Sequence, residues 1–184
     1  MSVVVDTVST YRAEDLVQPG MPYKCTELIE GELVVCEPAG KYHNRIASKF
    51  LFVFYEFCKS RPDLDYGNDN EGFVVQRNPD TLLSPDACLF RKRPETNSVW
   101  MEFAPEIAVE VLSPTNRRTE IAYKRQKYFG AGGEQMWIAD PENQTLEICF
   151  RNGTRMLVEG EEVVNGEGIA EGMEICLREI FEKS

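Results

Sequence analysis

Large apolar residues recur at helical spacing in one long segment of the chain. Within residues 41–59 they stand three or four positions apart, at Ile46, Phe50, Phe54 and Phe57. This spacing predicts an amphipathic helix with one wide apolar face. Because the apolar stripe is wide, we expect the helix to pack against a flat partner, which is typically a β-sheet.

Shorter apolar runs predict strands before and after this helix. A hairpin is expected from Cys25–Ile29 and Glu32–Cys36, with Glu30-Gly31 forming the turn. Residues 107–112 (IAVEVL) are almost wholly apolar, which is typical of a central strand covered on both faces. The other predicted elements are strands at residues 73–76, 83–90, 135–139, 145–150 and 155–159, and helices at residues 11–18, 117–130 and 177–182.

The central order of elements is helix, strand, strand, strand, helix, strand. This order predicts an α/β fold with a mixed β-sheet flanked by helices. The chain has 184 residues, of which 42% are hydrophobic. We therefore expect a single domain over residues 1–184, with the first ten residues frayed. No apolar run approaches the roughly 18 residues of a membrane span, and the N-terminus lacks the pattern of a signal peptide. A cytoplasmic protein without membrane contact is expected.

Composition narrows the chemistry further. The six cysteines form no C-x-x-C pair, so buried reduced thiols are favoured over disulfides or a zinc site. The net charge is −11, which counts against a chain that coats DNA by bulk electrostatics. A single histidine excludes multi-histidine metal centres within one chain. Phosphate-binding P-loops, dinucleotide-binding glycine motifs and the G-x-S-x-G nucleophile motif are all absent from the sequence.

Two carboxylates lie in unusually apolar surroundings. Asp86 follows Pro85 within one predicted strand, and Glu110 interrupts the most apolar strand. An unpaired ionised carboxylate is costly to bury, and two neighbouring carboxylates repel each other unless a cation lies between them. A divalent metal ion would resolve both problems. Alternatively, Asp86 caps a turn and Glu110 pairs with an arginine or with Lys124.

Further polar residues could join these two acids. On the predicted helix 117–130, Glu120, Lys124 and Tyr128 share one face, and Lys124 could reach back to the carboxylates. The other interpretation is an ordinary surface Glu–Lys pair. His43, in the first turn of the long helix, and Glu32, at the start of a strand, are weaker candidates. Helix-end solvation or a core hydrogen bond is favoured over catalysis for His43, and a turn carboxylate is a common explanation for Glu32.

The ordered motifs of the chain resemble the PD-(D/E)XK nuclease superfamily, and most closely its Uma-two family of restriction endonuclease-like proteins. The match spans roughly residues 11–182. It rests on E-L-I-E-G-E-L at residues 27–33, His43, P-D at 85–86, P-E-I-A-V-E-V-L-S-P at 105–114, E-x-x-x-K-x-x-x-Y at 120–128, Gly132, Trp137 and D-P at 140–141. The resemblance implies a restriction endonuclease-like core (αβββαβ), here with an added N-terminal hairpin and C-terminal antiparallel strands.

The resemblance also implies metal-dependent hydrolysis of phosphodiester bonds. Asp86 and Glu110 then hold Mg²⁺ or Mn²⁺, with Val111 as a further ligand through its carbonyl. The motif lysine expected two positions after Glu110 is replaced by Leu112, and Lys124 is the candidate for a lysine that has migrated to the helix. The additional residues implied at the site are Glu32, His43, Ser113 and Tyr128, and the candidate phosphate contacts are Arg117 and Arg118.

The expected partner is nucleic acid, most simply DNA, and a homodimer is expected. A nuclease-fold binding module without catalysis is the alternative, favoured by the acidic surface and by the missing lysine. A third hypothesis is a structural subunit of a homo-oligomer that uses the C-terminal strands as its interface.

Overall fold

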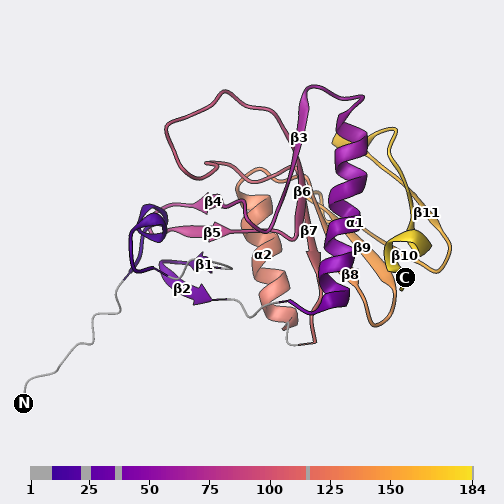
Figure 1. The fold of residues 1–184 in the computed structure, drawn as a ribbon, viewed down its shortest axis with the longest axis horizontal. Helices are drawn as coiled ribbons and strands as arrows, with labels where there is room; N and C mark the ends of the chain where they lie inside the picture. Colours follow the sequence, from indigo (N-terminus) through magenta and orange to yellow (C-terminus); the bar gives the residue numbers. More distant parts are fainter. Residues whose placement is uncertain (1–9, 22–25, 36–38, 115–116, 184) are drawn as a thin grey trace, which may run out of the picture.

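A six-stranded sheet forms the centre of the molecule. The computed structural model describes residues 10–21, 26–35, 39–114 and 117–183 (Figure 1). The sheet has the order β10-β9-β8-β7-β6-β3, in which β7 and β8 run parallel and all other neighbours are antiparallel. Its strands are β3 (Leu64–Asn68), β6 (Ala87–Arg91), β7 (Ile107–Val111), β8 (Gln135–Asp140), β9 (Thr145–Phe150) and β10 (Arg155–Glu159).

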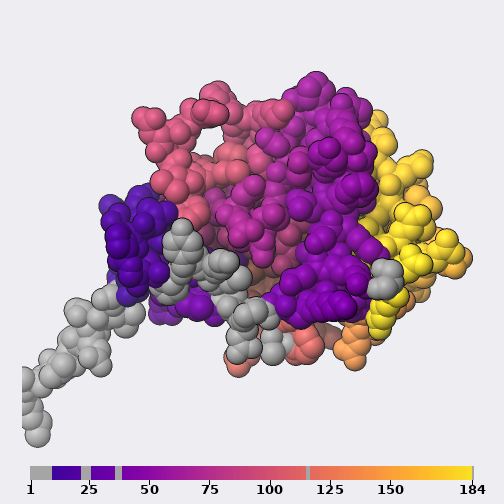
Figure 2. All heavy atoms as spheres, in the orientation of Figure 1, coloured from indigo at the N-terminus to yellow at the C-terminus, as the bar shows by residue number. Residues whose placement is uncertain are grey.

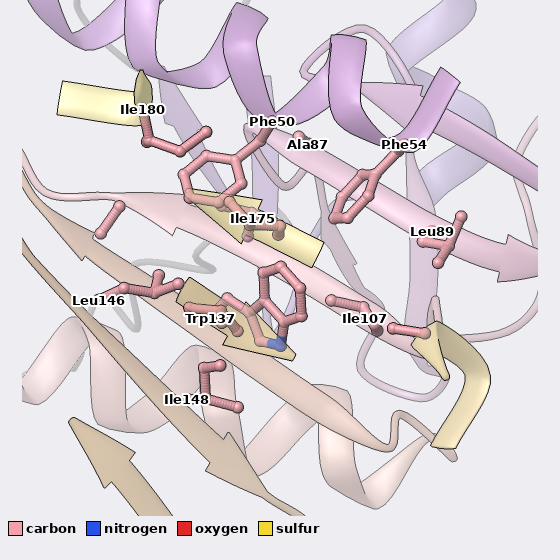
Figure 3. Packing of buried hydrophobic residues seen from close by; sticks show 14 of the residues in the cluster. Phe50, Phe54, Ala87, Leu89, Ile107, Trp137, Leu146, Ile148, Ile175 and Ile180 are labelled. Carbon is pink, nitrogen blue, oxygen red and sulfur yellow. The ribbon is translucent and has the colours of Figure 1, made fainter. Parts of the chain in front are cut away.

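Two helices cover the two faces of this sheet. Because strand side chains alternate between faces, Ile107 and Val109 pack with α1 (Lys41–Cys58), whereas Ala108 packs with α2 (Arg118–Gly130). Figure 3 shows Phe50 and Phe54 of α1 pointing toward Trp137 on β8. The Phe54 and Trp137 ring centroids are 5.7 Å apart. The apolar stripe of α1 therefore packs on a flat sheet, as its width predicts.

A smaller four-stranded sheet, in the order β2-β1-β5-β4, lies beside α2. Its strands are β1 (Thr26–Ile29), β2 (Glu32–Val35), β4 (Phe73–Gln76) and β5 (Thr81–Leu83), and the 3-10 helix η1 (Ala13–Val17) packs against it. The predicted hairpin is confirmed over its described residues, while Cys25 and Cys36 lie outside them. Glu30 and Gly31 both have positive φ (53° and 83°), as a tight two-residue hairpin turn requires.

The C-terminal part of the chain closes the α1 side of the core. It consists of β11 (Val163–Asn165), the 3-10 helix η2 (Gly168–Ala170), β12 (Glu174–Cys176) and α3 (Leu177–Phe181). Figure 2 shows this yellow segment directly against α1, in purple. Lys49 of α1 fastens the end of the chain, because its ammonium donates to the backbone carbonyls of Glu179 (2.5 Å) and Glu182 (2.9 Å).

The element order α1, β3, β6, β7, α2, β8 confirms the predicted fold class, with one strand exchanged. The predicted strand 83–90 is wrong as a single element, because β5 ends at Leu83 and β6 begins at Ala87. Pro85 has no N–H to donate to a ladder, so the chain leaves one sheet there and enters the other. The segment 73–76 belongs to the small sheet, and β3, which the pattern missed, takes its place in the core. Among the described residues, no helix has the length and apolar character of a membrane span.

Candidate active site

The candidate site lies at the edge of the central sheet where the start of β6 is next to the end of β7. Ala87 pairs with Val109 in an antiparallel register, and Asp86 directly precedes β6. Continuing this register by one residue brings Asp86 opposite Glu110. Residues opposite each other in neighbouring strands project to the same face of a sheet, with Cβ atoms roughly 5 Å apart. Asp86 itself precedes the strand, and its carboxylate contacts the Val111 N–H and His43 of α1, whereas the Glu110 carboxylate contacts α2. The two acids are near enough that the Asp86 charge acts to raise the pKa of Glu110.

Glu110 is buried, at 6% exposure, and both of its carboxylate oxygens accept hydrogen bonds from α2. Lys124 Nζ lies 3.0 Å from Oε2, and the Tyr128 hydroxyl donates to Oε1 at 3.1 Å. Burial raises the pKa of Glu110 to about 7; the Lys124 charge opposes that rise, and the Asp86 charge adds to it. The contact with the Lys124 ammonium thus favours the charged carboxylate, whereas its burial favours the neutral one.

Lys124 is held between two acids rather than one. Its ammonium lies 3.0 Å from Glu110 and 3.0 Å from Oε1 of Glu27, a residue of β1 that is 4% exposed. Burial acts to lower the pKa of Lys124, but the two carboxylates outweigh it and raise that pKa above its ordinary value. Lys124 is consequently a permanent cation at neutral pH.

The Asp86 carboxylate is held by the end of β7 and by α1. Its Oδ2 accepts a hydrogen bond of 2.7 Å from the Val111 N–H and lies 3.4 Å from Nε2 of His43. Burial acts to lower the pKa of His43, but the hydrogen bond and charge of Asp86 outweigh that effect, and the pKa is raised. His43 Nδ1 is buried without a hydrogen-bond partner in the described part of the chain.

The remaining predicted residues lie at the border of this cluster or away from it. Ser113 is partly buried two residues beyond β7, while Arg117 and Arg118 are exposed at the start of α2. Glu32 is exposed on β2 and pairs in register with Ile29. Glu27, and not Glu32, contacts Lys124. Sequence reasoning gave Glu27 no role, although a carboxylate inside a predicted strand is the same signal that singled out Glu110.

A divalent cation would find a partial set of ligands here. Among the described residues, no group of three or more His, Cys, Asp or Glu side chains is arranged to hold a metal ion. Mg²⁺, however, is commonly held by one or two carboxylates, with waters and substrate phosphates completing its coordination. Asp86 and Glu110 would supply two carboxylates of such an incomplete, oxygen-only donor set, although both oxygens of Glu110 already accept hydrogen bonds from α2.

A family model described as "Putative restriction endonuclease", named Uma2, matches residues 20–178. The chain belongs to the Uma2 family. The Uma2 match includes all the acids described above, together with Lys124 and His43. No curated protein matches the chain.

This Uma2 chain is also similar to a solved structure, described as a "putative nuclease belonging to DUF820", from Anabaena variabilis ATCC 29413. The two share 18% sequence identity with a TM-score of 0.76, and the match covers 87% of this chain and 91% of the other. At that identity the likeness concerns the fold alone. It confirms the predicted restriction endonuclease-like fold.

Proposed function

We propose that this Uma2 protein is a metal-dependent endonuclease that hydrolyses phosphodiester bonds in DNA. The observation that carries the proposal is the buried Lys124 ammonium 3.0 Å from Glu110, with Asp86 near enough for its charge to act on Glu110. Two acids and a permanent cation in one cluster provide both metal ligands and a group that stabilises developing negative charge. Membership of a restriction endonuclease family makes a phosphodiester the substrate that this chemistry fits best.

Asp86 and Glu110 are the proposed ligands of Mg²⁺ or Mn²⁺, with the carbonyl of Val111 as a further donor. When bound, the ion would polarise a phosphoryl oxygen and lower the pKa of the attacking water. The Val111 N–H and His43 orient Asp86, so that the carboxylate keeps one direction toward the site. Tyr128 does the same for Glu110 through its hydroxyl.

Lys124 would act as an electrostatic group and not as a base. Because both flanking carboxylates raise its pKa, the ammonium keeps its protons at neutral pH. It can donate hydrogen bonds to the attacking water and to the phosphoryl oxygens, whose negative charge grows in the transition state. A neutral residue in place of Lys124 would leave the negative charge of the phosphoryl oxygens without a cationic partner.

DNA would approach from the start of α2. Arg117 and Arg118 are exposed there, directly after the segment that follows β7, and could contact phosphates on either side of the scissile bond. A local basic patch of this kind is compatible with a net charge of −11 on the whole chain. Action as a homodimer in the cytoplasm stays a prediction from the sequence.

Cleavage of plasmid and oligonucleotide DNA with Mg²⁺ or Mn²⁺ tests the proposal. We expect cleavage by the wild type, and its loss in Asp86→Ala, Glu110→Ala and Lys124→Ala. Glu30→Gln is the matched control, because Glu30 forms a 2.8 Å ion pair with Lys127 that also joins the hairpin to α2 but is exposed. Cleavage that survives in both Asp86→Ala and Glu110→Ala would refute the mechanism.

A binding module without catalysis is the second candidate, and one observation favours it. Leu112 occupies the position of the motif lysine and packs against the apolar cluster beneath α2. Calorimetry separates the two functions, because a binding module requires no divalent cation. Absence of Mg²⁺ and Mn²⁺ binding at millimolar concentrations would support the module.

A further inference from the structure

β10 forms one edge of the central sheet and pairs only with β9 in the part of the chain that the structure describes. The open side of an edge strand presents backbone N–H and C=O groups to which a further strand can bind. β10 contains no proline, and its centre is the apolar run Met156–Val158. Leu157, in the middle of this run, is 62% exposed. This edge is therefore suited to pairing with another strand.

The hydrogen bonds at the start of β10 show which of its backbone groups face outward. Hydrogen-bonded and non-hydrogen-bonded residue pairs alternate along an antiparallel ladder. The Phe150 N–H donates to the Thr154 carbonyl at 2.9 Å, which fixes this alternation where β10 begins. The residues whose N–H and C=O groups consequently face away from β9 are Arg155, Leu157 and Glu159. The Glu159 N–H agrees with this assignment, because it donates at 3.0 Å to the Glu162 carboxylate, beyond the strand.

The sequence of β10, R-M-L-V-E, is complementary to itself in the antiparallel orientation. A two-fold axis at Leu157 places Leu157 opposite Leu157 of a second copy, and Arg155 opposite Glu159 on both sides of the axis. These are also the residues whose backbone groups face outward. The register that brings opposite charges together therefore also aligns the backbone donors and acceptors. Opposite charges directly across an antiparallel pair stabilise it.

The side chains at this edge leave room for such a partner. Arg155 contacts Glu147 of β9 at 3.2 Å, yet its side chain remains 56% exposed. A guanidinium has five N–H donors, so Arg155 can bind a second carboxylate without losing the first. The Glu159 N–H would have to leave Glu162 to donate across the interface. The N–H groups of Arg155 and Leu157 can donate to a partner strand without that change.

We propose that this chain associates with a second copy of itself through β10, in an antiparallel pair centred on Leu157 that joins the two central sheets into one. The interface gives the homodimer expected from the sequence a defined surface. β9 and β8 separate β10 from β7, which carries Glu110. The proposal is therefore independent of the proposed function, and dimerisation and DNA cleavage can be measured separately.

Sedimentation equilibrium of the full chain, from micromolar to millimolar concentration, tests the proposal. We expect a wild-type dimer that dissociates on dilution. Arg155→Glu and Glu159→Arg each place like charges opposite each other on both sides of the axis, and each should weaken dimerisation about tenfold or more. An equimolar mixture of these two variants brings opposite charges together again and should form heterodimers with an affinity near that of the wild type. Arg61→Glu, in the segment before β3 at the other edge of the sheet, is the matched control and should not change dimerisation.

Each other outcome would overturn the proposal. A wild-type chain that stays monomeric at every concentration does so directly. A wild-type dimer that neither charge variant weakens must use another surface. Variants that are both weakened but do not combine with each other contradict the antiparallel register. Leu157→Asp provides a second measurement on an exposed side chain, because it places two carboxylates together at the axis. A Leu157→Asp dimer as stable as that of the wild type would contradict pairing centred on this residue.

Discussion

Glu71 offers a test of the structure that is independent of any activity. It lies in the connection between β3 and β4, is partly buried, and one of its carboxylate oxygens is buried without a hydrogen-bond partner among the described residues. Gly67 makes room for it, since a Cβ there would lie 1.4 Å from Glu71 Oε2. Burial, assisted by the charge of Asp65, raises the pKa of Glu71 from its ordinary value of 4.5 to about 7.

The raised pKa makes the stability of the fold depend on pH. Below about pH 4.5 the carboxyl is protonated in both the folded and unfolded chains, and burying it costs little. Above about pH 7 it is ionised in both, and the full cost of the buried charge is present. The free energy of unfolding therefore falls between these values as pH rises. The full difference corresponds to roughly 3.4 kcal/mol at 1.36 kcal/mol per pH unit, and solvent screening reduces it to about 1–2 kcal/mol.

Glu71→Gln should remove this cost. Urea unfolding followed by circular dichroism at pH 5 and pH 8 gives the difference in stability between variant and wild type at each pH. We expect little difference at pH 5 and a variant that is about 1–2 kcal/mol more stable at pH 8. The exposed Glu142→Gln serves as the matched control and should show no such change. A difference that is the same at both pH values, or a variant less stable at pH 8, would refute the reasoning.

Three further predictions follow from the site and the core. The first concerns Glu110, whose pKa is about 7, because a proton on this residue competes with a bound cation. Mn²⁺ affinity should therefore rise about tenfold per pH unit between pH 5.5 and 6.5 and level off above pH 7. A calorimetric titration that gives a flat pH profile would contradict this. Tyr128→Phe removes a donor to Glu110 and should weaken Mn²⁺ binding at pH 7 about tenfold without unfolding the chain, as measured by the same titration. Phe50→Ala deletes a fully buried ring whose centroid lies 6.2 Å from that of Trp137. Urea unfolding should show that the free energy of unfolding falls by about 3–5 kcal/mol. A fall below about 1 kcal/mol would contradict this packing.

Much of the fold could be predicted because its periodicity is local. The wide stripe of α1, the apolar run of β7 and the Glu30-Gly31 turn each carry enough signal within a few residues. β3 could not be recognised, because Asp65, Gly67 and Asn68 all have low strand propensity. It is a strand only because it pairs with β6 at the edge of the sheet, and the paired residues, from Asn68–Ala87 to Leu64–Arg91, lie far apart in the sequence.

The site was predictable where a charge interrupts an apolar pattern. Glu110 in β7 stands out for that reason, and Lys124 follows from its position on the next helix. Glu27 was missed because the register of the hairpin against α2 is a tertiary feature that spacing does not encode. The choice between Glu27 and Glu32 depends on which of the two strands lies in the interior of the small sheet. β1 pairs with both β2 and β5, so Glu27 is enclosed, whereas β2 is an edge strand and Glu32 is exposed.

The replacement of the motif lysine by Leu112 has a physical explanation in the packing beneath α2. Alternation along the chain after Glu110 directs Leu112 to the same face, where it joins the apolar cluster with Ile121 of α2. A lysine at this position would bring its ammonium into that cluster without the carboxylate of Glu27, which lies on β1. From α2, one turn beyond Ile121, Lys124 reaches both Glu110 and Glu27. The ammonium of this cluster therefore comes from α2, where Glu110 and Glu27 share it.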